Sequence, residues 1–149
     1  MSGVLDVDRP AIAASAATRW ASLVTRNIDC PVDPRTLSIW ARFVGASVPT
    51  LRSRCRAIGV GTKDSLDFTR LLRALVRALK ARSDPVLEFD VCDSRTVRRL
   101  FERGGLGDPY SRSSLPPIGQ FLIAQRLVSH RVALHCVAAE LAARGNLVL

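Results

Sequence analysis

Residues 35–60 read RTLSIWARFVGASVPTLRSRCRAIGV, and their helical spacing of apolar residues is interrupted once, at Gly45–Ser47. Gly45 can adopt the positive φ that ends a helix, Ser47 can accept a hydrogen bond from the next helix's first amides, and Pro49 fits a first helical turn. The stretch therefore predicts two short helices joined by a tight turn. Because Ala41 and Gly45 are small, the two helices can cross closely, which favours a helix-turn-helix.

The second of these helices is predicted to have one apolar and one polar face. Leu51, Cys55 and Ile58 share the apolar side, so the other positions face outward. The planar guanidinium of arginine can donate two parallel hydrogen bonds to a guanine base or to a phosphate. The candidate DNA contacts are therefore Ser47, Pro49, Thr50, Arg52, Ser53, Arg54 and Arg56. The alternative is a merely solvated face, because exposed arginines are common on the helices of small proteins.

Composition supports a helical, nucleic-acid-binding class of protein. The chain has 149 residues, 48% of them hydrophobic and few aromatic, which predicts one all-helical domain or one module with appendages. A net charge of +9 and a pI near 10.9 indicate a polyanionic partner, of which nucleic acid is the commonest soluble example. Residues 42–82 contain 10 basic and 2 acidic side chains, so the positive charge is concentrated there.

Other classes of protein find little support in the sequence. The cysteines are isolated and read as small buried residues in a reducing compartment: Cys30, Cys55, Cys92 and Cys136. His130 and His135 are five residues apart, which is wrong for two metal ligands on one helix face. Without a nucleophile–base pattern, a phosphate loop, a leader or a membrane span, we expect no enzyme activity, no cofactor, no metal, no membrane contact and a cytoplasmic location.

The flanking segments also have helical patterns. Asp8 and Pro10 signal the start of a helix that continues to Ile28, with Trp20 as its packing anchor, and a loop follows up to Pro34. A long helix is predicted for 64–83, DSLDFTRLLRALVRALKARS. One basic stripe runs along it, and we expect its side chains to contact the DNA backbone if they face it: Arg70, Arg73, Arg77 and Lys80. Simple solvation of the stripe is the alternative.

The residue pattern of the second helix of residues 35–60 recurs later in the chain. Thr50, Leu51 and Arg52 correspond to residues 96–98, TVR, at a spacing of 46, and a glycine follows in both places. Before this echo, VLEFDVC predicts an irregular or barely helical piece, with a short strand as the alternative. The echo adds a second set of candidate DNA contacts: Arg95, Thr96, Arg98 and Arg99.

With both units in view, residues 35–106 resemble the DNA-binding module of the AraC/XylS type. In that family a long helix joins two helix-turn-helix units, each of which places one helix in successive major grooves. The residues LSIWARFVGASVPTLRSRCRAIGVGTKDSLDFTRLLRA carry most of the resemblance. The second unit departs from it: VLEFDV replaces a full helix, and Val91 and Cys92 replace a glycine and an aromatic residue. No fused ligand-sensing domain is seen, so no small-molecule effector is expected.

The predicted fold is all-α: a helix-turn-helix module with a long linker helix, flanked by N- and C-terminal amphipathic helices. We assign residues 1–34 to a packing helix and loop, 35–106 to the DNA-binding region, and 107–149 to a linker and an apolar C-terminal helix. That last helix could form a homodimer or pack on the monomer's own core. Sequence-specific binding to double-stranded DNA is the favoured function. A protein-interaction adaptor and a non-specific nucleic-acid-binding protein are the alternatives.

Overall fold

The computed structural model describes residues 2–90, 93–111 and 115–146, with side chains described from residue 14 onward. These residues form an all-helical fold, which confirms the predicted class. In chain order the elements are α1 (Ser2–Arg26), η1 (Asn27–Asp29), α2 (Leu37–Val44), α3 (Val48–Ala57), α4 (Thr62–Ala81), η2 (Pro85–Glu88), α5 (Ser94–Arg103), α6 (Ile118–Ala124) and α7 (Arg131–Ala143). The two η elements are single 3-10 turns.

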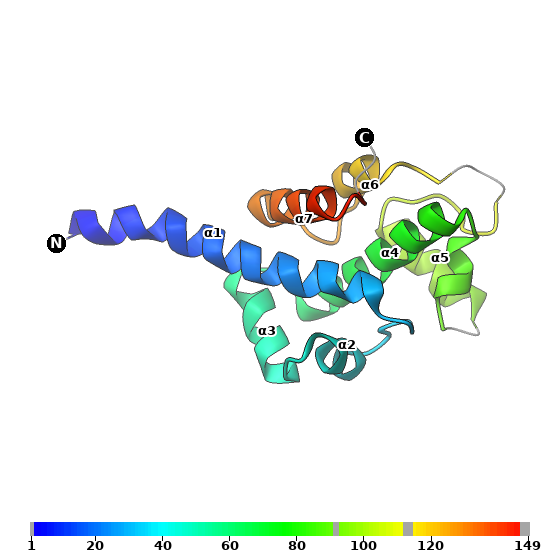
Figure 1. The fold of residues 1–149 in the computed structure, drawn as a ribbon, viewed down its shortest axis with the longest axis horizontal. Helices are drawn as coiled ribbons and strands as arrows, with labels where there is room; N and C mark the ends of the chain where they lie inside the picture. Colours follow the sequence, from blue (N-terminus) through cyan, green and yellow to red (C-terminus); the bar gives the residue numbers. More distant parts are fainter. Residues whose placement is uncertain (1, 91–92, 112–114, 147–149) are drawn as a thin grey trace.

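The longest helix, α1, separates two groups of elements (Figure 1). On one side α7 packs along it, and on the other side lie α2 and α3. The chain then enters α4, which contacts η1, η2, α5 and α6. Helix α4 is therefore the element against which η2, α5 and α6 are assembled, whereas α7 packs on α1.

Three aromatic rings join these groups in the core. Trp20 of α1 stacks on Phe68 of α4, and Phe68 stacks on Phe121 of α6, with ring centroids 5.8 Å apart in both pairs. All three side chains are buried. The indole Nε1 of Trp20 also donates a 3.1 Å hydrogen bond to the Ser65 hydroxyl, so this polar atom is satisfied inside the core. Trp20 is thus an anchor, as predicted, and it fixes α1 on α4.

The turn between α2 and α3 has the chemistry that the sequence predicts. Gly45 ends α2 with φ +72°, a left-handed conformation that costs glycine little. The Ser47 hydroxyl accepts a 3.2 Å hydrogen bond from the amide of Thr50, and Pro49 lies in the first turn of α3. The predicted helix end and helix start are confirmed at these residues.

Two hydrogen bonds hold this corner against α1. The Trp40 indole donates to the carbonyl of Leu23 at 2.9 Å, and the Arg26 guanidinium donates to the carbonyl of Val44, also at 2.9 Å. Val44 is the last residue of α2, so Arg26 satisfies a carbonyl that has no partner within its own helix. The position of α2 is therefore fixed relative to α1.

The 46-residue echo in the sequence corresponds to two helices built alike. Both α3 and α5 have ten residues, and each begins after a capping side chain, Ser47 in one and Asp93 in the other. Both end in a glycine with positive φ, Gly59 at 68° and Gly105 at 69°. The buried positions correspond as well: Leu51 and Val97, Cys55 and Phe101. The backbone framework of α3 is thus repeated in α5.

The element that precedes each of these helices is not repeated. Residues 85–88, which correspond to 39–42 in α2, form only the turn η2, in agreement with the irregular piece predicted there. Asp84 caps this turn by accepting a 3.0 Å hydrogen bond from the amide of Val86. Val91 and Cys92, the other predicted departures, lie outside the described residues.

Two predicted helix boundaries are wrong. Helix α1 begins at Ser2 rather than near Asp8, and it passes through Pro10, where one backbone hydrogen bond is necessarily missing. The single C-terminal helix is two helices, because the buried Gln125 ends the first one. Its amide oxygen accepts from the amides of Leu127 and Val128, both at 2.9 Å, and so stabilises a turn. His130 then caps α7 by accepting a 3.0 Å hydrogen bond from Ala133.

The apolar face of α7 lies inside the molecule. Ala133, Val137 and Leu141 are fully buried, and α7 packs along α1. At this contact the hydroxyl of Thr25 donates a short hydrogen bond to the Glu140 carboxylate. Of the two alternatives that the sequence left open, the structure therefore shows this face packed on the chain's own core.

The two equivalent glycines predict a graded loss of stability. An alanine Cβ at Gly59 would meet nothing within 4 Å, whereas at Gly105 it would lie 2.6 Å from the carbonyl oxygen of Ala124. We expect Gly59→Ala to lower the free energy of unfolding by about 1–2 kcal/mol through backbone strain alone. Gly105→Ala should cost at least about 1 kcal/mol more, because it adds a clash with rigid backbone.

Urea denaturation of the two variants, followed by circular dichroism, measures this difference. Gly107→Ala is the control, because its Cβ would meet nothing within 4 Å and its φ is not positive. Equal losses at Gly59 and Gly105 would show that α6 does not approach Gly105 as described.

Candidate nucleic-acid interface

Helix α3 presents most of its predicted DNA contacts to solvent. Ser47, Pro49, Arg52, Ser53 and Arg56 are exposed, and Thr50 and Arg54 are half-buried. The opposite side is sealed, since Leu51 and Cys55 are 0% and 1% exposed. The amphipathic division predicted for this helix is therefore confirmed.

The arginines of α3 belong to the group of arginines without an ion pair among the described residues, which also includes Arg19, Arg42 and Arg82. Among the described residues, no ion pair or side-chain hydrogen bond involves Arg52, Arg54 or Arg56. The helix itself carries three arginines and no acid. Their guanidinium donors are thus available to phosphates or base edges without first breaking an internal contact.

Helix α5 also presents its predicted contacts outward, but they are not equivalent to those of α3. Arg95, Thr96, Arg98 and Arg99 are all exposed. The Thr96 hydroxyl donates to the Asp93 carboxylate at 3.1 Å, and Arg98 lies 3.6 Å from the carboxylate of Asp108. Part of this face is therefore occupied by contacts within the protein.

The DNA contacts predicted along the basic stripe of α4 are wrong for most of its length. Arg70 and Arg73 are 7% and 2% exposed, so neither can reach a DNA backbone. Arg70 forms a two-pronged salt bridge with Asp33, at 3.0 and 2.8 Å. Arg73 donates to the carbonyls of Cys30 and Glu88, at 2.9 and 3.0 Å. These side chains hold the loop after η1 and the turn η2 against α4.

Arg77 belongs to the same internal network. Its guanidinium donates to the Glu88 carboxylate at 2.9 Å and to the carbonyl of Ile28 at 3.2 Å, and the side chain is half-buried. Lys80, the last residue of the stripe, is exposed. Three of the four basic side chains of the stripe therefore bind groups within the protein. The acids that neutralise them, Asp33 and Glu88, lie outside residues 42–82.

The burial of Arg73 changes its electrostatics. Removal from water lowers the pKa of Arg73 below its usual value, and the nearby charge of Arg77 lowers it further. The carboxylates of Glu88 and Asp33 raise the pKa and so oppose this effect. The two acids therefore keep a charged guanidinium acceptable in the interior.

The sequence contains a signal for this network. Two segments next to the long helix, 29–34 and 86–92, carry acids between apolar or proline residues. Their local patterns predict a loop and an irregular piece, and neither pattern pairs these acids with the neighbouring arginines. Like charges spaced three and four apart on a helix repel each other, and here acids from other segments, Asp33 and Glu88, offset that repulsion.

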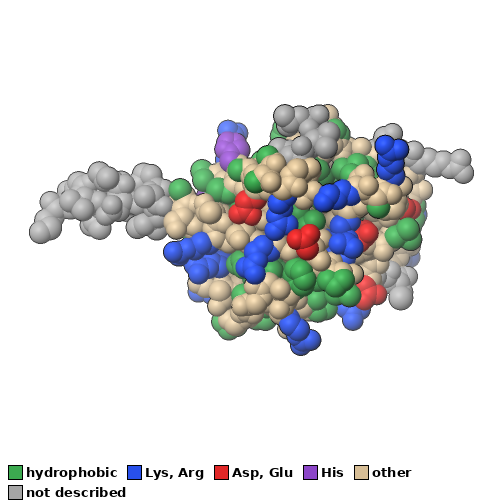
Figure 2. All heavy atoms as spheres, viewed as in Figure 1, with side chains coloured by type: hydrophobic (Ala, Val, Ile, Leu, Met, Phe, Trp, Pro, Cys, Tyr) green, Lys and Arg blue, Asp and Glu red, His purple; other side chains and the backbone are tan. Residues whose placement is uncertain are grey.

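Exposed charge is spread over the molecular surface. Figure 2 shows Lys and Arg side chains distributed among fewer Asp and Glu side chains on the face viewed. Several of the protein's arginines belong to ion pairs: Arg35 with Asp90, Arg103 with Asp64 and Asp67, and Arg144 with Asp29. Unpaired positive charge is therefore a more informative property of this protein than total positive charge.

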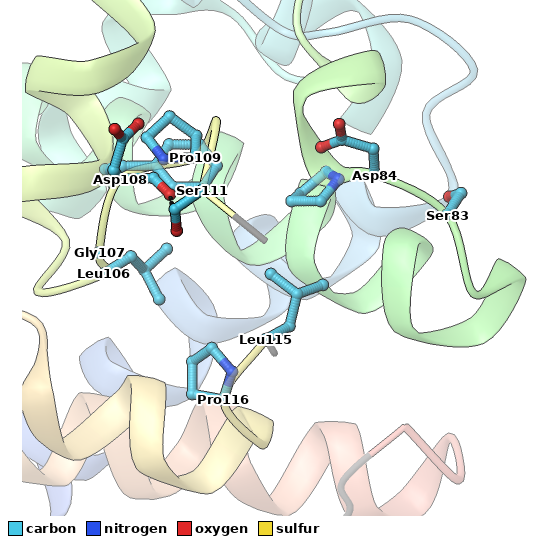
Figure 3. Close-up of a pocket in the computed structure, with 11 residues that line it drawn as sticks. Ser83, Asp84, Leu106, Gly107, Asp108, Pro109, Ser111, Leu115 and Pro116 are labelled. Atoms are coloured by element: carbon cyan, nitrogen blue, oxygen red, sulfur yellow. Dashed lines mark hydrogen bonds between the residues drawn. The ribbon is translucent and has the colours of Figure 1, made fainter. Parts of the chain in front are cut away.

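A cavity of about 220 Å³ is lined by residues 83–85, by Phe101 of α5 and by residues 106–109, 111, 115 and 116. Leu106, Leu115 and Pro116 border the space, and the carboxylates of Asp84 and Asp108 lie at its edge on the side away from Leu115 and Pro116 (Figure 3). Both acids already serve local structure, since Asp84 caps η2 and Asp108 contacts Arg98. The cavity wall is therefore partly apolar, and both of its carboxylates are already engaged by groups of the protein.

Comparison with known proteins gives no match to family models, curated proteins or solved structures. No three His, Cys, Asp or Glu side chains of the described residues come together as potential metal ligands. Within the same part of the chain, no helix combines the length and apolar character needed to cross a membrane.

The buried salt bridge on α4 predicts a large stability loss on removal of its acid. Asp33→Ala would leave the Arg70 guanidinium buried and unpaired, so we expect a loss of about 3–5 kcal/mol in the free energy of unfolding. Asp29→Ala is the matched control, because Asp29 pairs with Arg144 but its side chain is 73% exposed. That variant should lose about 0–1 kcal/mol. Chemical denaturation of both measures the difference, and similar losses would contradict the burial of Arg70.

The inner face of α3 predicts slow chemical labelling of Cys55. Burial raises the pKa of the Cys55 thiol, although contacts with Ser65 and Trp20 oppose the increase. Because only the thiolate reacts, N-ethylmaleimide at about pH 8 should modify the half-buried Cys136 first and Cys55 only as the protein unfolds. Mass spectrometry of timed digests distinguishes the two. Rapid labelling of Cys55 in the folded protein would show that α3 is not sealed against the core.

Proposed function

We propose that this protein binds double-stranded DNA in a sequence-specific manner and acts in transcription regulation. The observation that carries the proposal is the outer face of α3, where Arg52, Arg54 and Arg56 have no acidic partner among the described residues. Three arginines without internal contacts lose little on engaging a polyanion. A helix rigidly capped at both ends can also hold them in a fixed register.

In this proposal α3 enters the major groove. An α-helix with its side chains is about 10–12 Å across, which matches a groove about 12 Å wide, and the ten residues of α3 extend about 15 Å along their axis. Arg52 and Arg56 are exposed four residues apart, on neighbouring positions of one face, so both can reach base edges or the flanking phosphates. The hydroxyls of Ser47 and Ser53 supply further donors to phosphate.

The arrangement of the units supports the helix-turn-helix interpretation. The corner of α2 and α3 is closed by a left-handed glycine and a serine cap, and the framework of α3 alone recurs 46 residues later, in α5. These features agree with the resemblance of residues 35–106 to the AraC/XylS type. The reduced η2 agrees with a degenerate second unit.

A protein-interaction adaptor is the second candidate, and one observation favours it. A groove of about 580 Å³ runs between α6 and α7, and Ile123 at its edge is 87% exposed. Apolar side chains form much of its lining, among them Leu122, Val128 and Leu134. An adaptor would form a complex that depends little on salt, whereas DNA binding weakens steeply as salt rises.

The DNA proposal predicts a sequence-dependent effect of Arg52. Selection from a random duplex pool, followed by titration at about 50 and 200 mM salt, should yield a preferred sequence with salt-dependent affinity. Arg52→Ala should weaken binding to that duplex by about 1–3 kcal/mol and relax the preference at one position. Arg144→Ala removes the same charge from an ion pair with Asp29, so it is the control and should have little effect.

The outcome separates the candidate functions. Binding of all duplexes with equal affinity would indicate a non-specific nucleic-acid-binding protein. Absence of salt-dependent binding to any duplex would overturn the proposal and favour the adaptor.

A further inference from the structure

Arg98 in α5 occupies the position that Arg52 occupies in α3. The two residues are 46 apart, and each immediately follows a buried residue that faces the core, Val97 or Leu51. In the repeat they should therefore perform the same task. Their surroundings differ, because of the two only Arg98 has partners among the described residues.

A turn formed by residues 108–111 holds the Arg98 side chain. The Arg98 Nε lies 3.6 Å from Asp108 Oδ1, and the guanidinium carbon lies 4.9 Å from the centre of the Tyr110 ring. Both contacts are of kinds that attract a guanidinium, one an ion pair and the other a cation–π contact. The Asp108 carboxylate thus pairs with the charge of Arg98, and the Tyr110 ring lies against the guanidinium.

The turn has its own hydrogen bonds and does not depend on Arg98 for its shape. Asp108 Oδ1 accepts from the amide of Tyr110 at 2.9 Å, and the amide of Ser111 donates to the carbonyl of Asp108 at 3.1 Å. These bonds order the backbone of the turn and orient the Asp108 carboxylate. The turn is thus a preformed receptor for this arginine.

The rest of the α5 face also differs from α3 in a way that disfavours base reading. Glu102 takes the place of Arg56, so an acid stands where α3 has a guanidinium. A carboxylate this close to the DNA repels phosphate. Arg95 and Arg99 are exposed and have no ion pair among the described residues, so they can still contact phosphates.

We propose that the Asp108–Tyr110 turn sequesters Arg98, so that the protein reads sequence through α3 alone while α5 contributes only phosphate contacts. The inference rests on the proposed DNA binding. It identifies Asp108 and Tyr110 as residues that set specificity without touching a base. Both contacts are solvent-exposed, at 54% for the Arg98 side chain and 52% for Asp108, so their release should have a modest effect.

The test is a gain of function in the full chain. The double substitution Asp108→Asn with Tyr110→Ala should raise affinity for the selected duplex by about three- to tenfold at low salt. Repeated selection should then yield a second block of preferred bases. Asp29→Asn removes the same charge from another exposed arginine pair, with Arg144, and serves as the control for net charge. Tyr110→Phe keeps the ring and should behave like the unaltered chain.

Arg98→Ala decides whether the gain comes from this arginine. In the unaltered chain it should leave the preferred sequence unchanged, and in the double variant it should abolish both the added affinity and the second block. The inference is overturned if the double variant behaves like Asp29→Asn, or if Arg98→Ala in the unaltered chain relaxes the preference as Arg52→Ala does. Failure of the unaltered chain to bind any duplex overturns the proposed function and this inference together.

Discussion

The buried salt bridge between Arg70 and Asp33 is the contact on which the arrangement around α4 depends. A guanidinium cannot remain unpaired in a protein interior, so the loop that carries Asp33 has to close over α4 whenever that helix packs. The same carboxylate also accepts a 3.1 Å hydrogen bond from the amide of Asp90. One acid therefore joins α4, the loop after η1 and the segment after η2.

This network neutralises the arginines of α4, so the unpaired positive charge of the described residues lies mainly on other elements. Arg70, Arg73 and Arg77 are matched by Asp33 and Glu88, and Arg103 is matched by Asp64 and Asp67. The basic side chains without an ion pair among the described residues include those of α3, Arg95 and Arg99 of α5, and exposed residues elsewhere such as Arg19, Arg42 and Arg82. The pairing therefore removes most of α4 from the candidate surfaces, whereas α3 keeps three arginines and no acid, although the charge of the sequence pointed equally to both helices.

Local features of the fold could be predicted from the sequence, and long-range pairings could not. The helix end at Gly45, the cap at Ser47 and the buried side of α3 follow from the chemistry of neighbouring residues, and all were predicted. The partner of Arg70 lies 37 residues away in a loop, and no helical period reports it. The break at Gln125 was missed although it is local, since its side-chain bonds reach only two and three residues along the chain. Its pattern is compatible with a continuous helix, and only the side chain's bonds to the following backbone end it.

Helices α3 and α5 show which parts of a repeated unit are required for folding. Their caps, two of their buried positions and their following glycines correspond, because each of these features satisfies a backbone group or fills the core, whereas the buried Leu100 corresponds to the half-buried Arg54. Their outward residues are not constrained in this way, and at these positions the two helices differ: Arg56 corresponds to Glu102, and Arg52 corresponds to an Arg98 held by its own turn. Two helices with one framework can therefore present different chemistry to a common ligand. Because packing requires the framework but not the outer face, the outer face is where a difference in function between the two units has to be sought.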